Sequence, residues 1–128
     1  MRERITVPGL IATTPRHVVT PDGESVLHFR MSSTQHREPD DTGPINWYGV
    51  IARHQLAENA LRSLIKGQYV IVTGALAIRD WESGERSGVS VEIEADTIGH
   101  DLSYGTAVFN RVVPKGRIQR TTVAGGVS

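Results

Sequence analysis

The sequence predicts an all-β domain with one short helix, folded as a small barrel. Several short segments carry apolar residues at alternate positions, which is typical of half-buried strands. One segment, residues 56–67, has its apolar residues at helical spacing instead. A long apolar run, residues 69–81, contains Gly74, and a glycine inside a strand favours the bend or bulge that a barrel needs.

Size and composition restrict the chain to one small domain. A length of 128 residues allows a modest core and leaves no room for a second domain. The absence of cysteine excludes disulfides and thiolate metal sites. No apolar run approaches the roughly 20 residues that span a bilayer, and the N-terminus lacks the apolar core of a signal peptide. We therefore expect a soluble, cytoplasmic protein with no membrane partner.

The residues that usually carry catalysis or bind metals show no suitable spacing. The chain contains no phosphate-binding loop and no serine, histidine and aspartate in a triad arrangement. The histidines are scattered without ligand spacing at His17, His28, His36, His54 and His100. We expect a protein that is not an enzyme and that binds neither a metal nor a cofactor.

The overall charge gives no support to a polyanionic partner, because Lys and Arg together number 14, as do Asp and Glu. A nucleic-acid function would need a local basic face instead. From residue 111 onward there are four cations and no acid. We predict a folded domain over residues 1–113 and a flexible basic tail over residues 114–128, which is either a second nucleic-acid contact or only a soluble tail.

The first half of the chain predicts three strands. Residues 4–12 alternate and form the first strand, and a turn at residues 20–23 leads to the second, residues 26–33. In the third strand, residues 45–53, strict alternation places Trp47 and Arg53 on one face and Tyr48 on the other.

The second half predicts a helix and a hairpin. The helix, residues 56–67, ends at Gly67, and the strand over residues 69–81 follows it. A hairpin tip at residues 82–88, which contains Arg86, leads to a returning strand over residues 89–96. The face of this strand that carries Glu92 is acidic, so we expect it to be solvated and a poor surface for phosphates. Residues 104–113 are compatible with an additional C-terminal strand.

Five strands with a helix between the third and the fourth is the order of the OB-fold, a Greek-key barrel that binds oligonucleotides and oligosaccharides. Another small barrel would give a similar pattern.

The residues at key positions resemble the bacterial single-stranded DNA-binding protein family. The resemblance extends roughly over residues 5–99, and each matching position is unspecific when taken singly. It rests on the following residues in this order: Gly9, Pro15, Pro21-Asp22-Gly23, Trp47, Leu56-Ala57-Glu58, Lys66-Gly67, Gly74 and Arg79-Asp80-Trp81.

The resemblance implies that the chain binds single-stranded DNA independently of sequence, in replication, recombination or repair. Bases would stack on Trp47 and Trp81, and Arg79 matches a cation of the family that contacts phosphates. We also expect Arg53 and Arg86 to bind the nucleic acid; the guanidinium of Arg53 can stack on a base, with less area than an aromatic ring. The family usually forms a homotetramer, in which Tyr48 would lie at an oligomer contact. The tryptophans could instead belong to the core, as isolated tryptophans often do. Their common face with Arg53 and Arg79 favours base stacking.

The chain also departs from the family pattern. Arg53 replaces a third stacking aromatic, no aromatic stands near Ser33, and Gly49 and Asp80 stand where cations are frequent. Residues 123–128 carry no acid, so partners recruited through an acidic tail are not expected. We therefore expect an accessory or shortened paralogue that binds DNA more weakly than a typical housekeeping member and associates with the nucleoid. The alternative is an OB-fold protein-interaction module whose nucleic-acid binding has weakened.

Overall fold

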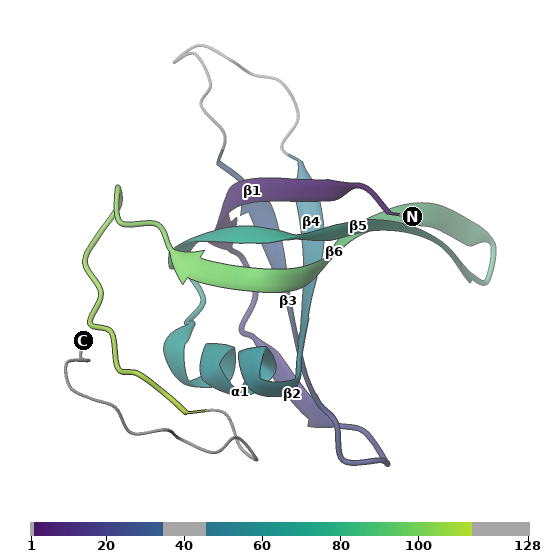
Figure 1. Cartoon of the computed structure of the whole chain (residues 1–128). Coiled ribbons are helices and arrows are strands. Elements are labelled where there is room, and N and C mark those ends of the chain that lie inside the picture. The colour runs from purple at the N-terminus through teal and green to yellow at the C-terminus, as the bar shows by residue number, and fades with distance from the viewer. Residues whose placement is uncertain (1, 35–45, 114–128) are drawn as a thin grey trace, which may run out of the picture.

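The computed structural model describes residues 2–34 and 46–113 and contains strands and one helix, arranged as Figure 1 shows. The elements in chain order are β1 (Arg4–Ile11), β2 (Arg16–Val19), β3 (Ser25–Ser33), β4 (Trp47–Arg53), α1 (His54–Ser63), β5 (Tyr69–Ser83) and β6 (Arg86–His100). The prediction of an all-β domain with one short helix is confirmed.

The sheet closes into a five-stranded barrel. Its strands pair in the order β1-β5-β6-β4-β3, and an additional pairing of β1 with β3 completes the ring. All contacts around the ring are antiparallel except the one between β4 and β6, where Gly49 pairs with Glu92 and Ile51 with Glu94. These are the predicted strands in OB-fold order, with α1 between β4 and β5.

The core fills the barrel interior with residues that alternate along the strands, as the sequence predicted. Leu27, Phe29 and Met31 of β3 are all fully buried. The helix α1 lies across one end of the barrel (Figure 1) and buries Ala57 and Ala60 in the same core. Apolar burial at about 25 cal/mol per Å² therefore stabilises strands and helix as one unit.

Gly74 lies at an irregularity of the barrel, and the predicted bulge is confirmed. The pairing of β5 with β6 shifts register between Thr73 and Gly74, which leaves Asp96 of β6 without an opposite residue. A Cβ at Gly74 would lie 2.1 Å from the backbone oxygen of Glu94. The two backbones therefore approach each other more closely here than any side chain would permit.

The sequence did not predict strand β2. Its four residues pair with β3 alone, from Arg16 opposite His28 to Val19 opposite Ser25. Because β2 lies on the outer edge of β3 and buries none of its residues fully, it has no alternation that would reveal it.

The predicted bounds of the helix were wrong at both ends. It begins two residues earlier, where His54 takes φ of 60° and turns the chain from β4 into α1 without a loop. It ends at Ser63, because Leu64 adopts extended backbone and is buried in the core. Gly67 has φ of 96°, as a left-handed residue should, but it lies in the turn before β5, where its N–H donates to the carbonyl of Ile11 at 2.8 Å.

The hairpin is longer than predicted. Its strands pair as far as Ser83 opposite Arg86, so the tip consists of Gly84 and Glu85 alone, and Arg86 is a strand residue. This end of β5 and β6 projects beyond the barrel (Figure 1). Backbone pairing continues there without a core beneath it, which explains why residues 82–88 show no apolar alternation.

The predicted strand over residues 104–113 is wrong. These residues form no strand, and residues 104–112 line a cavity of about 1230 Å³ together with α1 and the end of β6. The ring of Tyr104 stacks on that of Tyr69 with centroids 3.8 Å apart, which attaches the segment to the barrel. The predicted tail over residues 114–128 lies outside the described residues, as do residues 35–45 before β4.

Candidate nucleic-acid interface

The candidate interface is the side of β3, β4, β6 and β5 that points away from the barrel interior. It is called the outer face below. Strand register places its side chains in rows across the barrel. One row contains Arg30, Gly49, Glu92 and Ala77. Because residues two apart on a strand share a face, the predicted site residues of β4, β5 and β6 all belong to the outer face. These are Trp47, Arg53, Arg79, Trp81 and Arg86.

Trp47 stands at the start of β4, and 46% of its surface is exposed. The guanidinium carbon of Arg30 lies 5.1 Å from the centre of the Trp47 ring, a cation–π contact. Arg30 is paired with Gly49, two residues from Trp47 on the same face of β4, so it lies diagonally across the strands from the ring. Arg30 was not predicted as a site residue, although alternation along β3 already placed it on the outer side.

Trp81 lies on the projecting hairpin, and 44% of its surface is exposed. It is paired with Gly88 of β6. A Cβ on Gly88 would lie 2.7 Å from Cζ2 of Trp81, so the indole rests against bare backbone. The glycine therefore supports the ring from one side while leaving it accessible to a ligand.

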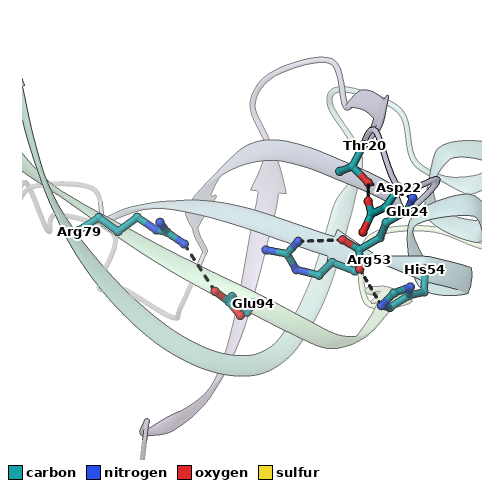
Figure 2. A network of polar contacts seen from close by, with 7 residues as sticks. All are labelled: Thr20, Asp22, Glu24, Arg53, His54, Arg79 and Glu94. Atoms are coloured by element: carbon teal, nitrogen blue, oxygen red, sulfur yellow. Dashed lines mark hydrogen bonds and ion pairs between the residues drawn. The ribbon is translucent and has the colours of Figure 1, made fainter.

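Two of the predicted cations are engaged with acids. Arg79 Nε lies 2.5 Å from Oε1 of Glu92, and its Nη2 lies 3.6 Å from Oε2 of Glu94. Arg53 Nη1 lies 3.6 Å from Oε1 of Glu24, whose other oxygen is 3.0 Å from His54 Nε2. Figure 2 shows the contacts of Glu94 and Glu24. Both arginines keep about half of their side-chain surface exposed and can still reach solvent.

Arg86 differs from these two arginines. It is exposed on β6, and it forms no ion pair with any residue in the described part of the chain. Among the predicted cations it is therefore the one whose guanidinium meets no carboxylate of a described residue.

The sequence predicts that the acidic face of β6 is solvated, but its carboxylates bind arginines. Glu92 binds Arg79, Glu94 lies 2.9 Å from Arg2, and Asp96 binds Arg4. A row of carboxylates thus lies in the middle of the outer face, with arginines from β5 and from the N-terminal segment around it. The expectation that this strand is a poor surface for phosphates stays a prediction.

His28 lies on the outer face beside Gly49, whose Cβ would be 3.2 Å from the imidazole Nε2. Partial burial lowers the pKa of His28 from its usual value; Glu92 opposes this, while Arg16 and Arg30 add to it. The imidazole is therefore neutral at pH 7 and contributes no charge to the surface.

Tyr48 lies on the opposite side of β4 from Trp47. It is half buried and packs against the core. Its predicted role at an oligomer contact stays a prediction.

A barrel of this order, whose outer face presents two half-exposed indoles near arginines, belongs to the class of OB-folds that bind single-stranded nucleic acid. Residues 2–101 match the family described as "Single-strand binding protein family". The chain belongs to this family, which confirms the resemblance in the sequence. Because these proteins bind DNA and are not enzymes, the prediction of a non-enzymatic protein is confirmed as well.

Individual relatives support the same assignment. The chain is 38% identical over 112 residues to "Single-stranded DNA-binding protein 2" of Tropheryma whipplei (strain Twist), which covers 84% of this chain and 74% of that protein. The crystal structure of a small single-stranded DNA-binding protein from Streptomyces coelicolor superposes with a TM-score of 0.74 at 34% identity, covering 81% of this chain and 98% of that one. The second such protein from Mycobacterium smegmatis gives 0.71 at 30% identity, covering 87% and 100%.

Proposed function

We propose that this protein binds single-stranded DNA without sequence preference, by stacking bases on Trp47 and Trp81, in replication, recombination or repair. The exposure of both indoles on one face of an OB barrel carries the proposal. Stacking is tolerant of sequence because every base has a π-face, and a duplex keeps its bases paired and out of reach.

Phosphate contacts supplement the stacking. Arg86 and Arg53 lie on the outer face with exposed guanidinium groups and are proposed to follow the DNA backbone. Arg30 supports Trp47 and is proposed as a further contact. Each neutralised phosphate adds a term to binding that falls with salt concentration. Arg79, the other predicted cation of this surface, is engaged with Glu92 and Glu94 and is not counted among these phosphate contacts.

The experiment that tests this proposal is a fluorescence titration with oligo-dT at low salt. Both tryptophans of the chain belong to the proposed interface, so stacking is expected to quench the signal to saturation. A duplex of equal length is expected to quench far less. Absence of quenching by oligo-dT would contradict the proposal.

The second candidate is an OB-fold module that binds a protein and has lost affinity for DNA. The ion pairs of Arg53 and Arg79 favour it, because cations that are already paired attract phosphates less. In that case oligo-dT and duplex would both leave the fluorescence unchanged, at low salt as well.

We propose that the protein forms a homo-oligomer, and specifically a tetramer. Apolar side chains after β6 are exposed in the single chain, among them Val108 at 87% and Phe109 at 86%, and association would cover them. Tyr48 is proposed at such a contact. Light scattering at micromolar concentration is expected to give four times the 14.0 kDa of one chain. A monomer would contradict the proposal.

The relatives named "protein 2", "small" and "second" suggest the cellular role. We propose that this chain is likewise an accessory member, which acts on DNA in the cytoplasm and associates with the nucleoid. Partners recruited through an acidic tail are not part of this proposal. Within residues 2–34 and 46–113, no helix combines the length and the apolar character needed to cross a membrane.

A further inference from the structure

We propose that Glu92 limits the affinity of the outer face for single-stranded DNA by holding Arg79 away from the phosphates. The ligand concerned is the phosphate backbone of the bound strand. This inference rests on the proposed function and adds an intramolecular competitor to it.

The contact between the two residues is close and sheltered. Arg79 Nε lies 2.5 Å from Oε1 of Glu92, and the Glu92 side chain is only 17% exposed. Its neighbour on β5 is Ala77, whose small side chain leaves room for the guanidinium of Arg79, two residues further along the same face. A carboxylate that has lost most of its water depends on its partner, because separation would leave a poorly solvated charge.

The other nearby carboxylates do not replace Glu92 as the main partner of Arg79. Glu94 lies 2.9 Å from Arg2, and Asp96 binds Arg4, so each has a cation of its own. Glu94 also reaches Arg79 at 3.6 Å, which adds to the hold on the guanidinium. Glu92 has no ion pair with a described residue other than Arg79.

This arrangement has a consequence for the salt dependence of binding. A phosphate that approached Arg79 would have to displace Glu92. The exchange would replace one anion by another beside Arg79 and would leave the Glu92 carboxylate without a cation. Arg79 therefore stays with Glu92 when the strand binds, and it releases no counterion from the DNA. Its guanidinium becomes available to a phosphate only when the charge of Glu92 is removed.

The test is Glu92→Gln, which keeps the shape and the hydrogen-bond acceptor but removes the charge. Oligo-dT is expected to bind about three- to tenfold more tightly at low salt. The slope of log affinity against log salt should steepen by about 0.7, the contribution of one phosphate of a single strand. The matched control is Glu58→Gln on α1, which removes an equal charge from a residue without an ion pair in the described part of the chain.

Arg79→Ala, made in both backgrounds, assigns the effect to this arginine. It should lower the salt slope by about 0.7 in the E92Q protein and leave the slope of the parent protein unchanged. Equal loss of slope in both backgrounds would overturn the inference, since Arg79 would then contact a phosphate already. The inference would also be overturned if E92Q bound no more tightly than E58Q. The proposed function would remain valid in that case, provided that the parent protein binds DNA. Failure of both E92Q and the parent protein to bind at low salt would overturn the proposed function too.

Discussion

Trp47→Ala is expected to weaken the binding of oligo-dT by about 5- to 150-fold. Stacking of one base on an aromatic ring is worth about 1–3 kcal/mol, and each 1.4 kcal/mol is a factor of about ten. Trp47 is 46% exposed and supported by Arg30 at 5.1 Å, so its ring is accessible and oriented. Fluorescence anisotropy of a labelled oligonucleotide measures the loss. Trp47→Phe keeps a ring and should lose less.

Leu61→Ala is the control for this experiment. Leu61 is an apolar residue of α1 with a similar exposure of 44%, but it lies away from the outer face. It should leave the affinity within about twofold, because truncating it removes no stacking surface for a base. If Trp47→Ala behaved like Leu61→Ala, the ring would not be a stacking site. The interface would then have to be sought elsewhere on the molecule.

Gly74→Ala is expected to destabilise the barrel by about 3 kcal/mol, at the upper end of the usual cost of overpacking. Its Cβ would lie 2.1 Å from the backbone oxygen of Glu94 and 2.8 Å from Cα of Ala95. Both are backbone atoms, so the neighbouring strand itself must shift at the bulge. Thermal unfolding followed by circular dichroism should show a melting temperature lower by roughly 10 °C.

Gly99→Ala provides the matched control on β6. A Cβ there would meet nothing within 4 Å. The same chemical change should be neutral, or stabilising by about 0.4–1 kcal/mol, because alanine restricts the unfolded chain more than glycine does. Equal melting temperatures for the two variants would show that β5 and β6 do not approach closely at Gly74.

The parts of the fold that bury side chains were predictable from the residues. Alternation placed Leu27, Phe29 and Met31 inside, and all three are fully buried. The glycine at position 74 predicted the bulge. A buried position demands an apolar side chain and a close approach demands glycine, so both leave a local mark in the chain.

The elements without a core beneath them were not predictable in this way. Strand β2 and the outer end of the hairpin are held by backbone pairing, which any residue except proline can supply. The start of α1 depends on the left-handed backbone of His54, an uncommon conformation for a residue other than glycine. Residues 104–113 carry an apolar pattern, but they pair with none of the described strands.

The chain alone placed Trp47, Arg53, Arg79 and Trp81 on one face, because side chains alternate along every strand. The family and the barrel fold could also be predicted from the sequence. Which charges meet on that face was decided by the tertiary structure. Arg79 and Glu92 belong to different strands, and only the register of β5 against β6 brings them within 2.5 Å. Arg30 reaches Trp47 for the same reason, since the register of β3 against β4 places the two residues diagonally across the strands. Contacts between strands depend on register, and register is set by the packing of the whole barrel.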